Sequence, residues 1–375
     1  MPTSRASIRT SLGENEILIF GDTLFSMVDN GIRRERGYHQ LRVKRVVREA
    51  EDTCSYVLDV PGDLADTFRY RPGQFCTFRV RVDGEEHLRS YSMSSAPETD
   101  PDLTVTVKRT PAGVVSNWFN DHVGEGHVLE VAKPAGVFCP RKGDHPVVAF
   151  CGGSGVTPVM SIVKSVLATS RRPARVFYAN RNRLSVIFDD QLRWLCSAHE
   201  DRLEVRYHYD SDDGVPEVRA VAAFAERTPD ADFYICGPGP FMDLVEGSLL
   251  GIGVDSEHIL IERFGDGARE TATAGASGEV EPPEAITLIL SGKKKTVNYQ
   301  AGDTVLETAR RGGLQPPFSC EAGNCATCMA VLRDGAAKMR VNNALTPEEV
   351  EEGWILTCQA LPEGPGTVTV EYESF

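Results

Sequence analysis

Four cysteines near the end of the chain have the spacing of ligands to an iron-sulfur cluster. Cys320, Cys325 and Cys328 form a C-x4-C-x2-C run, and Cys358 follows at a distance. Three thiolates from one short loop and a fourth from elsewhere are the ligand set of a plant-type [2Fe-2S] cluster, which carries single electrons. Gly323 lets the loop wrap closely around the metal, because glycine adopts left-handed conformations at little cost. A structural zinc site is the alternative, but its ligands usually come as two separated pairs.

A glycine-rich turn near the middle of the chain predicts a second site. Residues 152–158 read Gly-Gly-Ser-Gly-Val-Thr-Pro and follow an apolar run. Gly153 and Gly155 let the backbone approach a pyrophosphate, and the amides at the start of a following helix attract its charge. We expect Thr157 to be the N-cap of that helix and Pro158 its first residue. Because Pro158 replaces the third glycine of the usual dinucleotide pattern, a structural strand-to-helix connection is the alternative.

A short loop after the predicted strand 232–235 reads Cys236, Gly237, Pro238. Open parallel sheets bind ligands at the carboxyl ends of their strands, so a nicotinamide ring could lie against Cys236. The alternative is a rigid loop with a buried cysteine. Four further cysteines are expected to be buried structural thiols, namely Cys54, Cys76, Cys139 and Cys196.

An earlier strand-like segment carries groups that could bind a phosphate and a flat ring. Arg89, Tyr91 and Ser92 lie within four residues of one another. In an extended segment Arg89 and Tyr91 point to the same side, and an arginine fork binds phosphate well. Further on, Ser116 follows Gly113 and could cap a helix whose amides meet a diphosphate. Taken alone, such an arginine and tyrosine more often belong to an ordinary exposed strand.

The 375-residue chain has an ordinary globular composition, with 41% hydrophobic and 25% charged residues. Its formal net charge of −14 argues against nucleic-acid binding, which requires a basic surface. The first residues lack a signal-peptide pattern, and no apolar run approaches a membrane span. Ten cysteines, four of them with ligand spacing, fit a reducing compartment. We therefore expect a cytoplasmic protein that does not associate with a membrane.

The strand and helix patterns predict three domains after an N-terminal extension, residues 1–37, to which we assign no role. Alternating apolar residues over 38–141 indicate a small antiparallel barrel or sandwich. Strands that alternate with helices over 142–265 indicate a parallel sheet. Residues 266–283 have no apolar period and read as a flexible linker. Residues 284–375 hold the cysteine motif, strands and a short helix.

Taken in order, six short runs resemble motifs of one superfamily: RSYS, GVVS, GGSGVTP, YANR, CGPGPF and CEAGNCATC. The chain resembles the ferredoxin-NADP reductase superfamily joined to a C-terminal plant-type ferredoxin, over residues 38–375. It is most similar to the reductase components of 3-ketosteroid 9α-hydroxylases and, next, of phenylacetyl-CoA epoxidases. The resemblance implies an antiparallel β-barrel for the flavin, a parallel α/β sheet for the nicotinamide cofactor and a β-grasp ferredoxin domain.

By position, the resemblance assigns roles to the residues of the first domain. It implies that Arg89 binds the flavin pyrophosphate, Tyr91 packs on the ring and Ser92 hydrogen-bonds near the reactive N5 atom. Gly113 and Ser116 would hold a diphosphate, which favours FAD, although similar phthalate-type reductases use FMN.

The resemblance also implies the residues that contact the nicotinamide cofactor. Gly153, Gly155 and Thr157 would bind its pyrophosphate. Cys236, followed by Gly237 and Pro238, would lie beside the site of hydride transfer, so Ser92 and Cys236 are the expected catalytic pair. Phe264 matches the aromatic residue that shields the flavin.

Arg181 lies in the segment that distinguishes NADH from NADPH. The absence of Asp or Glu between residues 174 and 187, together with two arginines, would tolerate a 2′-phosphate. The similar steroid-hydroxylase reductases nevertheless look NADH-dependent. We expect NADH and leave NADPH open.

The resulting hypothesis is an electron-transfer reductase in which electrons pass from NADH to FAD, to the [2Fe-2S] cluster and to a separate terminal oxygenase of Rieske type, such as a steroid 9α-hydroxylase. Alternatives are a diiron monooxygenase or cytochrome P450 as the partner, a stand-alone flavin reductase, or a redox sensor. We expect a monomeric reductase that binds no nucleic acid.

Overall fold

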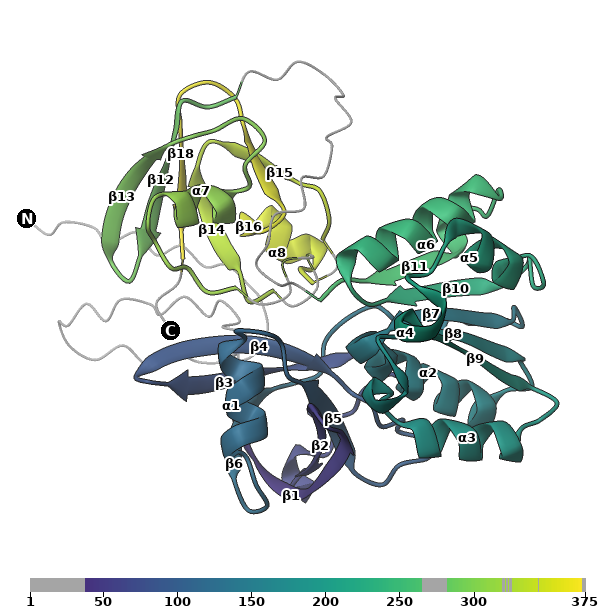
Figure 1. Ribbon diagram of the computed structural model, residues 1–375. Coiled ribbons are helices and arrows are strands. Elements are labelled where there is room, and N and C mark those ends of the chain that lie inside the picture. The colour runs from purple at the N-terminus through teal and green to yellow at the C-terminus, as the bar shows by residue number, and fades with distance from the viewer. Residues whose placement is uncertain are drawn as a thin grey trace, which may run out of the picture. The chain divides into compact units, whose positions relative to one another are not determined.

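The computed structural model describes residues 38–264, 282–318, 321, 323, 326–342 and 344–372. The N-terminal extension and residues 266–281 of the predicted linker lie outside the described residues. Within the described ranges the chain forms three large sheets, which follow one another from purple to yellow in Figure 1, and a two-stranded sheet whose strands lie in sequence between strands of the third. The exact domain boundaries stay predictions.

The first sheet is antiparallel, with the strand order β4-β3-β6-β1-β2-β5. Its strands are β1 (Tyr38–Ala50), β2 (Thr53–Asp59), β3 (Phe75–Val82), β4 (Glu85–Ser92), β5 (Leu103–Lys108) and β6 (Val128–Ala132). Met93, directly after β4, pairs with Val105 of β5 and so joins the two edge strands, as a barrel requires. Side chains from alternating positions, among them Leu41, Tyr56 and Phe78, fill its interior with no exposed surface. The antiparallel barrel expected from the sequence is confirmed.

The second sheet is parallel, with the order β11-β10-β7-β8-β9. Its strands are β7 (Val147–Gly152), β8 (Ala174–Asn180), β9 (Leu203–Tyr209), β10 (Asp232–Cys236) and β11 (Ile259–Glu262). Its longer helices are α2 (Val156–Thr169), α3 (Asp189–Ala198), α5 (Val218–Ala225) and α6 (Gly239–Gly251). Ala149 packs with residues of α2 and α3, whereas its neighbour Phe150 packs with residues of α5 and α6. Helices therefore cover both faces, which explains why β7 is apolar throughout.

The third sheet has the order β13-β12-β18-β14-β16. Its strands are β12 (Ala285–Leu290), β13 (Lys293–Asn298), β14 (Met329–Asp334), β16 (Trp354–Leu356) and β18 (Thr367–Glu371). The pair β12 and β18 is parallel and the other pairs are antiparallel. Helix α7 (Val305–Arg311) packs Val305 and Ala309 into the core of this sheet. A helix across a mixed sheet is the β-grasp arrangement that we expected.

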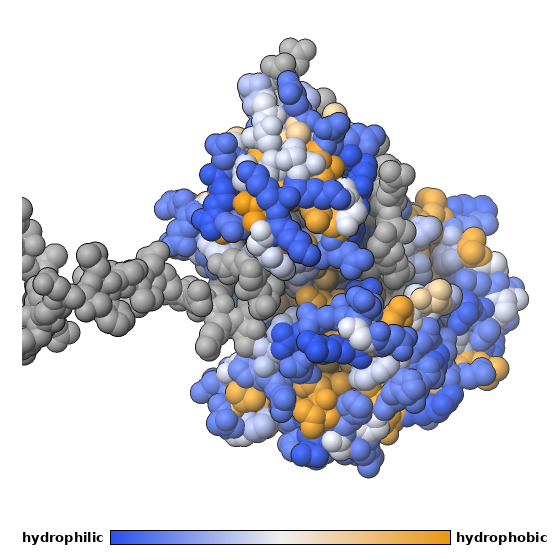
Figure 2. Space-filling view, turned by 90° about the vertical axis from the view of Figure 1, so that its left-hand side faces the viewer, coloured by the Kyte–Doolittle hydropathy of each residue, from blue (hydrophilic) through white to orange (hydrophobic). Residues whose placement is uncertain are grey.

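Three smaller elements complete the third part: β15 (Ala336–Met339) pairs with β17 (Ala360–Glu363), and α8 (Pro347–Glu351) precedes β16. No helix among the described residues is long and apolar enough to cross a membrane. The face shown in Figure 2 is mostly hydrophilic, with hydrophobic residues in small groups.

The barrel and the parallel sheet touch through helix α2. Ser161 on this helix donates a hydrogen bond of 2.6 Å to the carbonyl oxygen of Ser95, and Lys164 forms an ion pair of 3.0 Å with Asp100. Since α2 follows the glycine-rich turn, these contacts fix the turn relative to the barrel.

Candidate functional site

Strand β4 presents the first group of predicted site residues. In its pairing with β3, Tyr91 lies opposite Cys76 and Arg89 lies opposite Phe78. The Tyr91 ring packs edge-on against Phe119 of helix α1 (Val114–His122), with ring centroids 5.3 Å apart. Because Phe119 has no exposed surface, this contact fixes the tyrosine ring against the barrel core. The strand therefore offers a fixed aromatic face and a guanidinium two residues apart.

The start of α1 differs from our prediction in one respect. Gly113, not Ser116, is the N-cap of this helix, which begins at Val114. Ser116 lies in the first turn, where its hydroxyl accepts a hydrogen bond of 3.1 Å from the amide of Thr110. A side chain at Gly113 would come within 2.6 Å of the Ser116 hydroxyl, so the position requires glycine. The first amides of a helix have no intrahelical partner, and the diphosphate binding expected at this segment stays a prediction.

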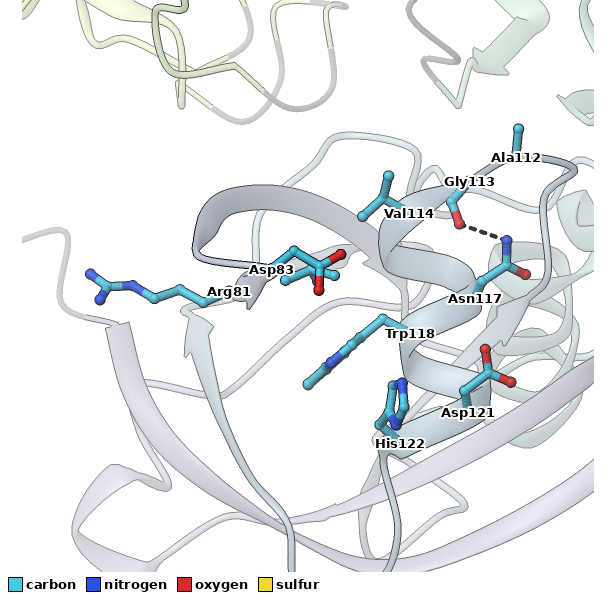
Figure 3. A pocket seen from close by; sticks show the side chains of 10 residues that line it. Arg81, Asp83, Ala112, Gly113, Val114, Asn117, Trp118, Asp121 and His122 are labelled. Carbon is cyan, nitrogen blue, oxygen red and sulfur yellow. Dashed lines mark hydrogen bonds between the residues drawn. The ribbon is translucent and has the colours of Figure 1, made fainter.

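A cavity of about 530 Å3 lies between α1 and the turn that joins β3 to β4 (Figure 3). Arg81 and Asp83 line it on the hairpin side, and Trp118 and His122 line it on the helix side. In Figure 3 the Trp118 side chain extends from the helix toward this hairpin. Gly113 is the one predicted site residue among those lining it. The sequence carried no signal for this cavity, because its two walls are about thirty residues apart.

The glycine-rich turn also begins its helix earlier than predicted. Helix α2 starts at Val156 with Gly155 as N-cap, so the predicted cap Thr157 and first residue Pro158 are instead its second and third residues. The reason is that Gly155 itself has helical dihedral angles. Thr157 is buried and donates a hydrogen bond of 3.0 Å to a carbonyl of the preceding turn. Gly153 has a φ of 52°, in the left-handed region that glycine adopts without steric cost.

The two predicted nucleotide loops meet at the carboxyl edge of the parallel sheet. A Cβ atom at Gly155 would overlap the carbonyl oxygen of Cys236, and one at Gly152 would lie 2.8 Å from the Pro238 ring. A Cβ atom at Gly237 would lie 2.9 Å from the backbone nitrogen of Gly152. The glycines therefore allow the two loops to pack backbone to backbone, a contact that neither sequence pattern predicted.

A buried carboxyl group links this edge to the barrel. In the pairing of β10 with β11, Glu262 lies beside Cys236, and the Ser92 hydroxyl donates a hydrogen bond of 3.2 Å to Glu262 Oε2. Burial raises the pKa of Glu262 to about 8, although the hydrogen bond from Ser92 opposes this shift. Burial also raises the pKa of the Cys236 thiol, which is fully enclosed. This junction can therefore hold a proton on a carboxyl group at neutral pH.

Glu262 was not among the site residues predicted from the sequence, although Phe264, two residues later, was. The available signal was an acidic residue at the end of the apolar run Ile259–Glu262, at the edge where parallel sheets bind ligands. Phe264 is 36% exposed, so its ring is accessible for contact with a ligand.

Two of the four predicted cluster ligands lie within the described residues. Cys328 and Cys358 are 3% and 5% exposed, and both belong to one apolar cluster. The amide and the hydroxyl of Thr357 donate hydrogen bonds of 3.2 and 2.7 Å to the carbonyl oxygen of Cys328. Since Thr357 directly precedes Cys358, these bonds tie the two cysteine segments together. Cys320 and Cys325 lie outside the described residues.

The described part of the cysteine loop is wound tightly. Glu321, Gly323 and Ala326 have φ angles of 48°, 75° and 52°, all in the left-handed region. Two of these residues are not glycine, so the surrounding structure must stabilise the turns. The Gln359 amide contributes a hydrogen bond of 2.7 Å to the carbonyl oxygen of Glu321 and approaches the Cys358 sulfur at 3.8 Å. Such a loop fits thiolates converging on a [2Fe-2S] cluster.

The structural thiols agree with prediction only in part. Cys76 and Cys139 are buried, whereas Cys54 and Cys196 are half-buried. Burial raises the pKa of each of these four thiols above its usual value, which disfavours the reactive thiolate.

Family models match each of the three parts of the chain. The oxidoreductase FAD-binding domain matches residues 40–139, the oxidoreductase NAD-binding domain matches residues 150–247, and the 2Fe-2S iron-sulfur cluster binding domain matches residues 288–363. The chain belongs to the family of flavin and iron-sulfur oxidoreductases that serve as reductase components of oxygenases. It combines domains for FAD, a nicotinamide cofactor and a [2Fe-2S] cluster.

Particular relatives agree with this assignment. The chain is 39% identical to the ferredoxin reductase component of 3-ketosteroid-9-alpha-monooxygenase from Rhodococcus rhodochrous, over 86% of this chain and 93% of the relative. It is 30% identical to one of the components of 1,2-phenylacetyl-CoA epoxidase from Escherichia coli, over 87% and 95%. The solved structure of phthalate dioxygenase reductase, described as modular for electron transfer from pyridine nucleotides to [2Fe-2S], is 25% identical over 90% and 99%, with a TM-score of 0.59.

Proposed function

We propose that the chain is an NADH-dependent reductase component that supplies electrons to a separate terminal oxygenase of Rieske type. The observation that carries this proposal is the hydrogen bond between Ser92 and Glu262. It joins the end of barrel strand β4 to the carboxyl edge of the parallel sheet, where nicotinamide cofactors bind in open α/β folds. A flavin ring beside Tyr91 and a nicotinamide ring beside Cys236 would meet at this junction.

On this proposal the barrel residues hold FAD. Arg89 and the first amides of α1 would bind its phosphates, and Tyr91 would pack against its ring. The cavity beside α1 supports FAD over FMN, because it adjoins Gly113 and offers the Trp118 face to an adenosine group. When bound, FAD converts a two-electron donor into single-electron steps.

Ser92 and Glu262 would control protons next to the ring. Because the pKa of Glu262 is about 8, this carboxyl group is mostly protonated at neutral pH. A neutral carboxyl group places no net charge beside the nicotinamide ring. Ser92 is the last residue of β4, and its hydrogen bond to Glu262 fixes the direction of its hydroxyl group. Cys236, with a protonated thiol, would shape the apolar wall of the same junction and supply no nucleophile.

The parallel-sheet loops would position the nucleotide. Gly153, Gly155 and Thr157 surround the start of α2, whose free amides would bind the pyrophosphate. Gly237 and Pro238, in the facing loop, would contact the nucleotide from the other side.

Cys320, Cys325, Cys328 and Cys358 would hold the cluster from which electrons leave the protein. The relatives named above serve different oxygenases, so the organic substrate belongs to the partner. The 39% identical relative supports a steroid 9α-hydroxylase as this partner. We also propose a cytoplasmic location, on the ground of the reduced cysteines that the cluster requires.

An anaerobic titration with NADH and then NADPH tests the proposal, with flavin and cluster absorption followed together. We expect NADH to bleach both groups, and NADPH to do so only at much higher concentration. Bleaching of the flavin with an unchanged cluster would contradict the proposal and favour a stand-alone flavin reductase. The matched partner test is product formation with purified Rieske, diiron and cytochrome P450 oxygenases.

A further inference from the structure

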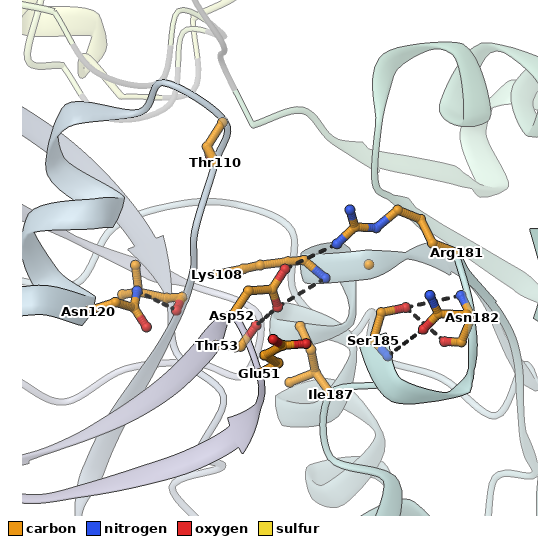
Figure 4. A network of polar contacts seen from close by, with 12 residues as sticks. Glu51, Asp52, Thr53, Lys108, Thr110, Asn120, Arg181, Asn182, Ser185 and Ile187 are labelled. Carbon is orange, nitrogen blue, oxygen red and sulfur yellow. Dashed lines mark hydrogen bonds and ion pairs between the residues drawn. The ribbon is translucent and has the colours of Figure 1, made fainter.

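An ion pair connects the barrel to the parallel sheet at the position where the adenosine ribose is expected. Arg181 directly follows β8, and its Nη2 atom lies 3.1 Å from Oδ2 of Asp52, between β1 and β2 of the barrel. Figure 4 shows the guanidinium of Arg181 extending to Asp52 across 129 residues of sequence. Thr53 donates a hydrogen bond of 2.9 Å to the other carboxylate oxygen and thereby fixes its orientation.

The location of Arg181 connects this ion pair with recognition of the adenosine ribose. In dinucleotide-binding sheets the end of the second strand holds the adenosine ribose, with an acidic residue for a 2′-hydroxyl or an arginine for a 2′-phosphate. Residues 174–187 contain no acidic residue, so the parallel sheet does not itself supply that carboxylate. Asp52 supplies one from the barrel.

A second observation points to a ligand at this edge. Asn180, the last residue of β8, is only 4% exposed, and neither its amide nitrogen nor its amide oxygen makes a hydrogen bond of normal geometry with the described residues. A side-chain interaction with Asn180 opposes the rise that burial causes in the Tyr178 pKa, but the Tyr178 hydroxyl also bonds to the backbone of Gly153 and Ile187 and is at most a weak partner of this amide. A weakly bonded buried amide is costly unless a bound molecule supplies further partners. Asn180 adjoins Arg181, so a ribose bound beside Arg181 could satisfy the Asn180 amide.

Asp52 lies among several cationic side chains at this edge of the sheet. A cavity of about 320 Å3 is lined by Asp52, Lys108 and Arg181, among others. Lys108 lies 3.7 Å from the same carboxylate. Arg109, which also lines the cavity, is paired with Asp121 at 2.6 Å. The group of Asp52, Lys108 and Arg181 therefore holds two cations against one carboxylate.

We propose that Asp52 selects NADH over NADPH by occupying Arg181, so that the cation next to the ribose is not available to a 2′-phosphate. This inference rests on the proposed use of a nicotinamide cofactor. A 2′-phosphate has to displace the carboxylate and then remain close to its negative charge, whereas a 2′-hydroxyl meets neither cost. The residue that selects the nucleotide, Asp52, thus lies on the flavin domain, although the nucleotide-binding loops lie on the parallel-sheet domain.

Binding of two nucleotides that differ only in the 2′-phosphate tests the proposal without turnover. Dissociation constants of 2′,5′-ADP and 5′-AMP are measured calorimetrically on the purified full-length protein and on its Asp52→Asn variant. We expect the ratio of the 2′,5′-ADP constant to the 5′-AMP constant to fall about tenfold in Asp52→Asn, which corresponds to the loss of one nearby charge at a partly exposed site. The matched control is Asp102→Asn, because Asp102 has 28% side-chain exposure against 27% for Asp52 and pairs with Lys44 of the barrel at 2.9 Å.

A double-mutant cycle identifies Arg181 as the group that Asp52 controls. In an Arg181→Ala background, Asp52→Asn should change the ratio less than about twofold, since the two effects act through one contact. An unchanged ratio in the single variant, or an equal fall in the Asp102→Asn control, overturns the proposal. Failure of the wild-type protein to bind 5′-AMP also overturns it. Failure of electron transfer to an oxygenase with the ratio intact would contradict only the proposed function.

Thermal unfolding of each variant is recorded alongside. Arg181 has 68% of its side-chain surface exposed, and pairs of this kind contribute little to stability. We therefore expect Asp52→Asn to melt within a few degrees of the wild type.

Discussion

Ser92 and Glu262 are separated by 170 residues and are joined by one hydrogen bond of 3.2 Å between a barrel strand and a strand of the parallel sheet. Glu262 is 5% exposed, and its Oε2 atom accepts from a hydroxyl at the end of β4. The contact places a carboxyl group of raised pKa at the junction of the first two domains. Several properties of the protein should depend on it.

The stability of the protein should fall as pH rises because of Glu262. Its pKa is about 8 in the folded protein against an ordinary value of 4.5, so unfolding releases a proton between these values. The stabilising effect is complete below about pH 4.5 and is lost as the pH rises through about 8. We expect the melting temperature of Glu262→Gln minus that of the wild type to increase from pH 5 to pH 8. For the exposed control Glu98→Gln, the difference in melting temperature from the wild type should stay constant over this pH range. A constant difference for Glu262→Gln would show that the Glu262 carboxyl group is not buried in the folded state.

Loss of the Ser92 hydroxyl should slow reduction of the flavin. Ser92→Ala leaves the Glu262 carboxyl group without its donor and removes the hydroxyl proposed to lie near N5. We expect the rate of flavin reduction by NADH in stopped-flow measurements to fall at least about tenfold, the equivalent of one lost hydrogen bond in the transition state. Ser90→Ala, on the same strand, serves as the matched control. Equal rates for both variants would argue against the role of Ser92.

The contact between the two nucleotide loops predicts a selective effect of added volume. A methyl group at Gly155 would overlap the carbonyl oxygen of Cys236, so Gly155→Ala must displace one of the loops. We expect destabilisation of about 1–3 kcal/mol and weaker binding of NADH. Gly247→Ala is the matched control, because nothing lies within 4 Å of a Cβ atom at this exposed position of α6. That control should be neutral or stabilising by up to about 1 kcal/mol, and a neutral Gly155→Ala would mean that the loops do not touch in solution.

Replacement of a cluster ligand should abolish reduction of cytochrome c but preserve reduction of ferricyanide. In Cys328→Ser we expect loss of the bound iron and of cytochrome c reduction, with NADH-dependent ferricyanide reduction preserved because ferricyanide takes electrons directly from flavin. Iron content, visible absorption and both activities provide the measurement. Cys196→Ser, a half-buried thiol on α3, should retain all four properties. Equal loss of both activities in Cys328→Ser would indicate a structural role for the cluster.

The sequence predicted best what is encoded within a few residues. The run from Gly152 to Pro158 could be placed between a strand and a helix because apolar periodicity and glycine spacing are local signals. The helix starts were less certain. Gly155 takes helical dihedral angles and so moves the cap two residues ahead of Thr157. Helix α1 begins at Val114, so Ser116 lies inside its first turn and cannot be its N-cap, and the Ser116 hydroxyl accepts from Thr110 instead.

The residues that could not be predicted from the sequence depend on contacts between distant segments. Asp52 is a single acidic residue in ordinary surroundings of sequence, and the only signal for Glu262 was its place at the end of the apolar run Ile259–Glu262. Their roles appear only when the barrel and the parallel sheet are brought together, since one reaches Arg181 and the other Ser92. Arg181 and Ser92, their partners, could be predicted as site residues because each lies in a motif.

The contacts of helix α2 with the barrel set a rule for recombining these reductases. Ser161 binds the backbone of Ser95, and Lys164 pairs with Asp100. A chimera that exchanges only the nicotinamide domain keeps Ser95 and Asp100 on the barrel, so it retains the two contacts only if the incoming helix has a hydroxyl at the position of Ser161 and a cation at the position of Lys164. Crossover points in such chimeras therefore have to be chosen by matched pairs across the junction, with the two domains inherited as one unit.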